Sequence, residues 1–474
     1  MPKMKRISLL VLAAVTIVGC VVFASCSNRT GGERGRGRAA ESWPGPAPRD
    51  LGGMVFRIAN AYWRDNHLFP NPDEIGTPVG NAKQAVLDSI AEDFNITFEF
   101  VPIAPTEMLN RLQPAVMAGD PFVHLVITTM WAMGQLIGAG LMGDLASVPG
   151  LNLESDLWSH PIHQVTTIGG KVQATMAVFN NVDWQTCLIF QKSLWNDLNL
   201  PDPYEMVRRG EWTWDRFREY SVAAAADLNG DGVIDSTNDR WGFVAIPSIH
   251  TLHSGMGGRC FDIHPETGRL YLSVATPGGI AVADRLRAFS EIPGAWYREV
   301  NGDPERNEMF FTRRCLFYEF PVANMALYFP EMEDDFGILP YPKWDEQQPA
   351  YRNDITHNAV LMGIPITNNQ KEETGIILEA LAARSASVME LQKADFEIRI
   401  LRSDEDIEMF NSYIMPYPSY DIGHLMIFAG YSFDAPIGYL SAYIITHAIN
   451  DFASEIESVR EAVEFNINEV FFVD

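Results

Sequence analysis

Three tryptophans stand where an indole could stack on the apolar face of a ring-shaped ligand. Trp63 follows the first predicted strand, Trp131 follows the predicted strand 122–128, and Trp184 lies beside Asp183. A parallel sheet presents its ligand-binding edge at the carboxyl ends of its strands, where Trp63 and Trp131 fall. A place in the hydrophobic core is the alternative for any single tryptophan. We predict that these three residues are stacking platforms.

Four polar residues are candidates for recognising the hydroxyl groups of such a ligand. Glu319 directly follows the predicted strand 315–318, and the other three lie in predicted loops. The alternative for each is a solvated surface group or a loop group with its hydrogen bonds already satisfied. No catalytic residue is predicted. The predicted ligand-binding residues are Trp63, Trp131, Asp183, Trp184, Glu319, Asn353 and His357.

An acidic loop between residues 227 and 239 resembles a calcium-binding loop. Oxygen atoms at alternate positions could converge on one ion because Gly232 permits a sharp turn. The twelfth position is Asn238 where an EF-hand has a bidentate glutamate, so the alternative is an Asx-rich turn. A structural Ca²⁺ is the one cofactor considered, and none is required. Its predicted ligands are Asp227, Asn229, Asp231, Val233 and Asp235.

The N-terminal segment has the pattern of a lipoprotein signal peptide. A basic start precedes the apolar run 7–23, and small residues lead to Cys26. We predict a signal peptide over 1–25, lipidation of Cys26 and a flexible tether over 26–50. Cys20 is an alternative lipidation site, and an uncleaved membrane anchor is an alternative to processing. The predicted location is the extracellular face of a bacterial cytoplasmic membrane.

Charge and cysteine content exclude two classes of protein. The formal net charge of −26 argues against nucleic-acid binding through the general electrostatic field. Beyond the leader only Cys187, Cys260 and Cys315 remain, and their odd number cannot form a complete set of intrachain disulfides. The hydrophobic core must therefore stabilise the fold, and 474 residues allow two or more domains.

Strands and helices alternate in the first part of the chain, which predicts an α/β fold. The pattern gives strands at 53–60, 96–100 and 122–128 and helices at 81–94, 106–118 and 130–141. This order implies a mostly parallel sheet with helices on both faces.

The second part of the chain predicts further strands and helices. Thr213 is the predicted cap of a helix from Trp214, and Trp195, Trp212 and Trp214 are expected to be structural. The predicted strands are 186–190, 315–320, 336–339 and 359–364. The predicted helices are 193–198, 372–384, 437–450 and 455–466.

The order of several short motifs resembles the extracellular solute-binding proteins, family 1, the lipoproteins of carbohydrate ABC importers. The resemblance covers residue 51 to the C-terminus. Its motifs are MAGDPF at 117–122, IGGKV at 168–172, IFQKSLW at 189–195, GEWTWDRF at 210–217 and DFGILPYP at 335–342.

This resemblance implies a two-lobed clamp of the periplasmic-binding-protein type II (maltose-binding-protein-like) fold, with parallel-rich mixed sheets. Lobe one would hold 51–165 and 366–430, and lobe two would hold 170–355 and 431–474. The chain would cross between them near 177–183 and 357–365. The implied protein is a monomer, is not an enzyme, and delivers a sugar or oligosaccharide to ABC permease subunits. The alternatives are a secreted glycoside hydrolase and a lipid-tethered adhesin.

Overall fold

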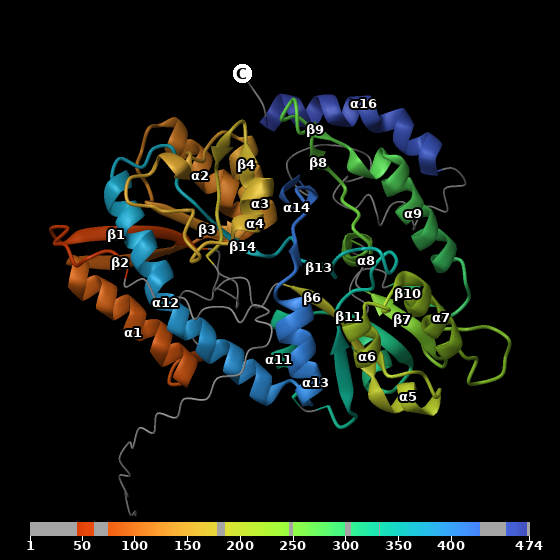
Figure 1. Cartoon of the computed structure of the whole chain (residues 1–474). Coiled ribbons are helices and arrows are strands. Elements are labelled where there is room, and N and C mark those ends of the chain that lie inside the picture. The colour runs from red at the N-terminus through yellow and green to blue at the C-terminus, as the bar shows by residue number, and fades with distance from the viewer. Residues whose placement is uncertain are drawn as a thin grey trace, which may run out of the picture. The chain divides into compact units, whose positions relative to one another are not determined.

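The two largest sheets in the described part of the chain are mixed, one of four strands and one of five (Figure 1). The computed structural model describes residues 45–60, 74–177, 185–245, 250–298, 305–330, 332–426 and 452–471. All of them belong to one unit that begins at Pro44. No helix in these ranges is long and apolar enough to span a membrane. The predicted signal peptide, most of the tether and both candidate lipidation cysteines lie outside the described residues.

The first sheet has the order β14-β3-β1-β2. Strand β1 is parallel to both β2 and β3, and β14 is antiparallel to β3. Its strands are β1 (Met54–Asn60), β2 (Ile96–Pro102), β3 (Leu125–Thr129) and β14 (Val360–Gly363). The helices between the first three are α1 (Pro78–Phe94), the short η2 (Pro105–Glu107) and α2 (Met108–Met117), and α3 (Met130–Gly138) follows β3. The predicted alternation of strand and helix is confirmed.

Local sequence explains why α1 forms where it does. The Thr77 hydroxyl accepts the backbone N–H of Gly80 at 3.0 Å, which satisfies one of the unpaired donors at the start of the helix. The buried Ile90 and Phe94 lie on one face of the helix, and Asn95 ends it with a left-handed φ of 48°.

The second sheet has the order β10-β7-β11-β6-β12. Strands β10, β7 and β11 are parallel, whereas β6 is antiparallel to both β11 and β12. Its strands are β6 (Thr186–Gln191), β7 (Trp241–Ala245), β10 (Trp296–Arg298), β11 (Cys315–Pro321) and β12 (Phe336–Leu339). Helices in this part are α5 (Lys192–Asp197), α6 (Pro203–Arg209), α7 (Trp214–Ala224), α8 (His250–Gly255), α9 (Pro277–Ser290), α10 (Glu305–Phe311) and α11 (Val322–Tyr328). The predicted α/β class with parallel-rich mixed sheets is confirmed.

The core beside the second sheet is aromatic. Trp195, Trp212 and Trp214 are buried among other rings, as expected for structural tryptophans. Thr213 is the N-cap residue of α7, which begins at Trp214 as predicted. Thr213 has the extended backbone of a capping residue, but its hydroxyl accepts no capping hydrogen bond, and its backbone carbonyl accepts the N–H of Phe217.

Three chain segments pair where the two sheets are connected. The segment before β6 and the segment before and within β14 run antiparallel, with bridges between Thr175 and Met362 and between Gln185 and Ile355. β13 (Asn353–Asp354) lies in the second connection and pairs in parallel with β15 (Pro418–Ser419). We call residues 173–177, 185, 353–362 and 417–421 the junction. Residues 178–183 of the first predicted crossing lie outside the described residues.

The long helix α12 (Lys371–Arg399) extends well beyond the predicted 372–384 and contacts α1 (Figure 1). It is followed by α13 (Asp404–Glu408) and the π-helix η6 (Met409–Ile414), which contact β12 of the second sheet. The predicted helix 437–450 lies outside the described residues, and the lobe boundaries stay a prediction.

The remaining elements are short or peripheral, apart from the C-terminal helix. They are η3 (Leu145–Ser147), α4 (His160–Thr166), β4 (Thr167–Ile168), β5 (Lys171–Val172), β8 (Asp262–Ile263), β9 (Leu270–Tyr271), η5 (Ser273–Ala275), α14 (Gly423–Met426) and α16 (Phe452–Phe471). Helix α16 contains the predicted helix 455–466.

Candidate functional site

Buried polar side chains gather around the junction and come from elements that are far apart in sequence. Helix α8 contacts β13 of the junction, and α14 packs on α3 of the first sheet. The contact between α3 and α14 is close because residue 134 is a glycine. A Cβ at Gly134 would lie 1.7 Å from the Leu425 carbonyl oxygen. We call the set the junction cluster. Its members are Thr251, Ser254, Glu319, Asp354, Asp421 and His424.

Glu319 is a predicted site residue that the structure buries almost completely. It lies in β11 and is 1 % exposed. The Thr251 hydroxyl donates to its Oε2 at 2.6 Å, and Oε1 has no hydrogen-bond partner among the described residues. Burial raises the pKa of Glu319 to about 8, against weaker opposing effects of Thr251 and of the Arg306 charge. The group therefore holds its proton at neutral pH.

Asp354 lies in β13 and is 2 % exposed. Burial first, and then the charges of Asp421 and Glu319, raise its pKa far above the ordinary range, while the Ser254 hydroxyl opposes the rise. His424 Nε2 lies 3.7 Å from Asp354 Oδ2. Asp354 thus lies beside one histidine and near two other carboxyl groups, whose negative charges disfavour its own ionised form.

Asp421 is better compensated than the other two acids of the cluster. Its Oδ2 accepts the backbone N–H of Cys260 at 2.6 Å, and its Oδ1 accepts that of Gly423 at 2.8 Å. Ser254 donates to the Ser419 hydroxyl at 2.8 Å, which ties α8 to β15. The cluster is therefore part of the contact between α8, the junction strands and α14.

Trp131 and His357 lie at the edge of this cluster and are partly exposed. The backbone N–H of Trp131 donates to the His357 carbonyl at 3.3 Å. The rings of His357 and His424 lie 6.3 Å apart. An indole and an imidazole with accessible surface, beside buried carboxyl groups, could bind a ligand that carries both an apolar face and hydrogen-bonding groups. The structure thus brings Trp131, Glu319 and His357 into one region.

Asn353 lies in the same region but its side chain binds backbone groups. It is fully buried, its Oδ1 accepts the N–H of Tyr341 at 3.2 Å, and its Nδ2 donates to the carbonyls of Tyr413 and Ile414. These bonds hold η6 against the end of β12. Of the other predicted ligand-binding residues, Trp63, Asp183 and Trp184 lie outside the described residues.

Sequence reasoning missed Thr251, Asp354, Asp421 and His424. Asp354 had a signal, because it is adjacent to Asn353, a predicted ligand-binding residue that precedes the second predicted crossing. The other three had none, since short helices and single bridges leave no periodic pattern.

The acidic loop forms a series of Asx turns. Asp227 accepts the backbone N–H groups of Gly230 and Gly232 at 2.6 and 2.7 Å, and Asp231 accepts that of Val233 at 2.8 Å. Among the described residues no group of three or more His, Cys, Asp or Glu side chains is placed to hold a metal ion. Calcium binding by Asp227, Asn229, Asp231, Val233 and Asp235 stays a prediction.

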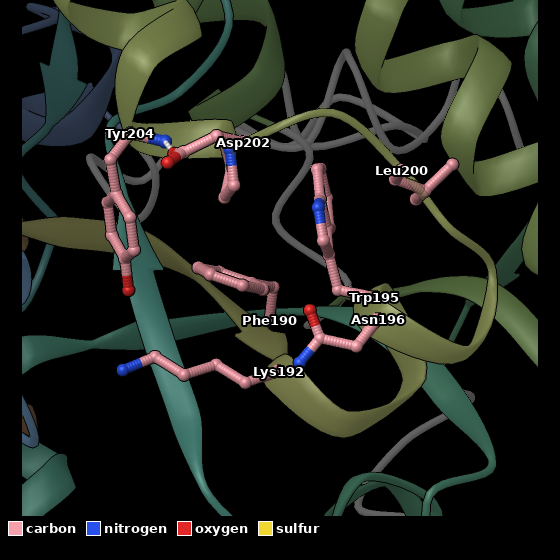
Figure 2. Close-up of a pocket in the computed structure, with 8 residues that line it drawn as sticks. Phe190, Lys192, Trp195, Asn196, Leu200, Asp202 and Tyr204 are labelled. Atoms are coloured by element: carbon pink, nitrogen blue, oxygen red, sulfur yellow. Dashed lines mark hydrogen bonds between the residues drawn. The ribbon is translucent and has the colours of Figure 1, made fainter.

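A cavity of about 330 Å³ lies beside α5 and α6, away from the predicted site residues (Figure 2). The rings of Phe190 and Trp195 face it and pack edge to face at 5.2 Å. Asp202 is used as the cap of α6, and the Trp195 Nε1–H donates to the Pro201 carbonyl at 2.9 Å. These polar groups hold the local fold together, so we do not assign the cavity a ligand.

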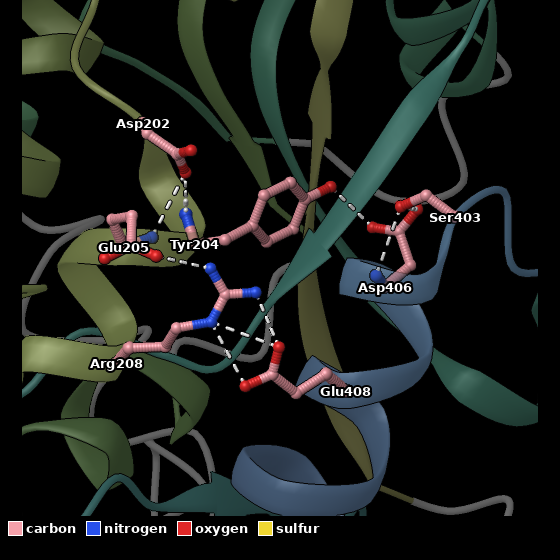
Figure 3. A network of polar contacts seen from close by, with 7 residues as sticks. All are labelled: Asp202, Tyr204, Glu205, Arg208, Ser403, Asp406 and Glu408. Atoms are coloured by element: carbon pink, nitrogen blue, oxygen red, sulfur yellow. Dashed lines mark hydrogen bonds and ion pairs between the residues drawn. The ribbon is translucent and has the colours of Figure 1, made fainter.

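Next to this cavity, Asp406 of α13 is the centre of a buried polar network (Figure 3). It accepts the Tyr204 hydroxyl at 2.7 Å, the Ser403 hydroxyl at 3.0 Å and the Lys192 ammonium at 3.0 Å. It also accepts the backbone N–H of Ile338 at 3.0 Å. We call these contacts the Asp406 network. They fasten α13 to β12 and to the start of α5 and α6.

Comparison with solved structures identifies the fold. An ABC substrate-binding protein from Listeria monocytogenes, in complex with cycloalternan, aligns with a TM-score of 0.52 at 13 % identity over 88 % of this chain and 98 % of that one. The cyclic alpha-maltosyl-1,6-maltose binding protein from Arthrobacter globiformis aligns with a TM-score of 0.56 at 12 % identity over 87 % and 99 %. UgpB from Mycobacterium tuberculosis, in complex with glycerophosphocholine, gives 0.53 at 13 % over 88 % and 98 %.

The chain therefore has the fold of the ABC-transporter solute-binding proteins, the class that its ordered motifs resemble, and the type II fold prediction is confirmed. The Listeria and Arthrobacter proteins are both named as binding proteins. No protein-family model matches the sequence, and no curated protein matches it.

Proposed function

We propose that this protein is an extracellular, lipid-anchored substrate-binding protein that captures a sugar or oligosaccharide and delivers it to an ABC permease. The observation that carries the proposal is the fold. Solved binding proteins share this fold over 87–88 % of this chain. The names of two of them include a sugar, cycloalternan in one and cyclic alpha-maltosyl-1,6-maltose in the other. Trp131 and His357, partly exposed beside a buried polar cluster, suit a ligand with an apolar face and hydroxyl groups.

In the proposed mechanism the ligand acts by shifting a conformational equilibrium. An open and a closed clamp differ in the surface that they offer the ligand, and the ligand stabilises the closed form by its higher affinity for that form. The permease would recognise the closed form. No cofactor takes part in this mechanism, and the protein would act as a monomer.

Two alternatives remain distinct from this proposal. A glycoside hydrolase needs a carboxylic acid and a carboxylate placed about 5–10 Å apart across a substrate site. The acids of the junction cluster are buried, and burial raises the pKa of both Glu319 and Asp354, which disfavours the ionised carboxylate that this chemistry needs. An adhesin would bind sugar without a permease.

The proposal is tested by a thermal-shift screen of sugars, followed by isothermal titration of the best ligand. Trp131→Ala should weaken binding by about thirtyfold or more, as for a central aromatic contact. Trp344→Ala is the matched control, since that partly exposed tryptophan stacks on Arg285 at 3.6 Å instead. Release of reducing ends on incubation would support the hydrolase. Equal affinity of Trp131→Ala and wild type would show that the site is placed wrongly.

The lipid anchor and the permease need separate tests. The intact mass of the membrane-bound form should correspond to a chain that begins at Cys26 with attached lipid. A chain beginning at Met1 without lipid would refute the anchor. Ligand-dependent stimulation of ATP hydrolysis by the reconstituted importer would support delivery, and high-affinity binding without any stimulation would favour the adhesin.

A further inference from the structure

The acids of the junction cluster sit at the point where the two sheets are linked. Glu319 lies at the end of β11, opposite Leu188 in β6, three residues from the bridge between Gln185 and Ile355. Asp354 lies in β13 itself, next to Ile355. A change in either side chain therefore acts on the connection between the sheets.

Few donors compensate these two acids. Glu319 Oε1 and Asp354 Oδ1 have no hydrogen-bond partner within the described part of the chain. A buried carboxylate without partners is costly, whereas the protonated acid is not charged and can itself donate a hydrogen bond. The packing seen here thus suits the protonated forms of both groups.

The neighbouring titratable and charged groups do not neutralise an ionised pair. Two cationic or potentially cationic groups approach, namely Arg306 of α10 near Glu319 and His424 of α14 near Asp354. Two further histidines belong to the same elements, His253 in helix α8 and His357 beside His424. The remaining neighbours are Asp421, Cys187, Cys260 and Tyr341.

We propose that the junction is a proton-dependent latch, in which protonated Glu319 and Asp354 hold α8, β13 and α14 together and their ionisation loosens this packing. The raised pKa of Glu319, about 8, sets the range in which loosening begins. Its effect on ligand binding rests on the function proposed above, because a loosened junction would lower the population of the closed clamp.

Hydrogen exchange on the full chain tests the latch without any ligand. After correction for the intrinsic exchange rate, amides of α8, β13 and β15 should lose about tenfold in protection between pH 7 and pH 9, since the protonated fraction of one group of pKa 8 falls by about that factor. Amides of β1 and β3 should not change. Glu319→Gln should remove the pH dependence. Glu461→Gln, an exposed residue of α16, should keep the wild-type profile.

Sugar affinity gives the second readout. The wild type should bind about tenfold more weakly at pH 9 than at pH 7, whereas Glu319→Gln should show the same affinity at both pH values, whatever that affinity is. Should that variant fail to fold, Asp354→Asn serves the same comparison. The latch is refuted when the wild type shows no pH-dependent loss of protection, or when both amide variants retain it. Loss of the exchange effect in Glu319→Gln together with no sugar binding at any pH would refute the proposed function and leave the latch supported.

Discussion

Two buried acids in this protein have opposite surroundings. Asp406 and Glu319 are both 1 % exposed. Asp406 accepts hydrogen bonds from Lys192, Tyr204, Ser403 and a backbone N–H. Glu319 accepts one, from Thr251.

The difference separates a structural acid from a functional candidate. A buried carboxylate with a cation and several donors can stay ionised and fix one arrangement of the chain. A buried acid with a raised pKa and few donors can change charge near neutral pH, and such groups cluster at functional sites. The Asp406 network therefore holds one arrangement through several donors, whereas Glu319 in the junction cluster has a pKa of about 8 and few donors.

The largest expected effect comes from removing the structural acid Asp406. Asp406→Ala should destabilise the protein by about 3–5 kcal/mol, because Lys192 would lose its buried partner. Urea unfolding measures this. The control Glu408→Gln removes a more exposed ion pair with Arg208 and should cost about 0–1 kcal/mol. Equal losses in the two variants would contradict the assignment of Asp406 as the centre of the network.

A second variant tests whether Asn353 is a structural residue or a ligand-binding residue. Asn353→Ala leaves the Tyr341 N–H and two backbone carbonyls without this partner, so it should cost about 1–3 kcal/mol of stability. Sugar affinity per folded molecule should not change. A loss of affinity with unchanged stability would return Asn353 to the ligand-binding residues.

The pH dependence of the free energy of unfolding tests the raised pKa of Glu319. Folded Glu319 keeps its proton up to about pH 8, whereas the unfolded chain releases it near the ordinary value of 4.5. The folded state therefore binds more protons between these values, and stability falls as pH rises through them. Thr251→Val removes a donor that favours the ionised form, so the fall should continue to higher pH, at a cost of about 1–2 kcal/mol. Urea unfolding from pH 5 to pH 9.5 checks this, and a wild-type curve that rises over this window for Glu319 would contradict it.

The smallest effect concerns the acidic loop, whose carboxylates accept backbone N–H groups. Millimolar Ca²⁺ should raise the thermal midpoint by about 1–2 °C over an EGTA-treated sample, as expected for a weak ligand of the folded state. Asp231→Asn should remove the shift. Identical midpoints with Ca²⁺ and with EGTA would leave the loop as a set of Asx turns.

The sequence by itself determined the elements of the fold and their order. The spacing of Ile90 and Phe94 and the alternating strands are local signals, and local signals are readable from one chain. The ordered motifs determined the fold class. The sequence did not predict the full length of α12 or the absence of a side-chain capping hydrogen bond at Thr213, because packing and hydrogen-bond geometry override local propensity there.

Only the tertiary structure decided which side chains meet. Thr251, Glu319, Asp354 and His424 are separated by up to 173 positions in the sequence, and the pairing of β13 with β15 and the packing of α14 on α3 bring them together. The structure also decided which buried acid has several donors, as in Asp406, and which has only the Thr251 hydroxyl within the described residues, as in Glu319. Burial and donor geometry are long-range properties of the folded chain, so residue type and spacing could not supply them.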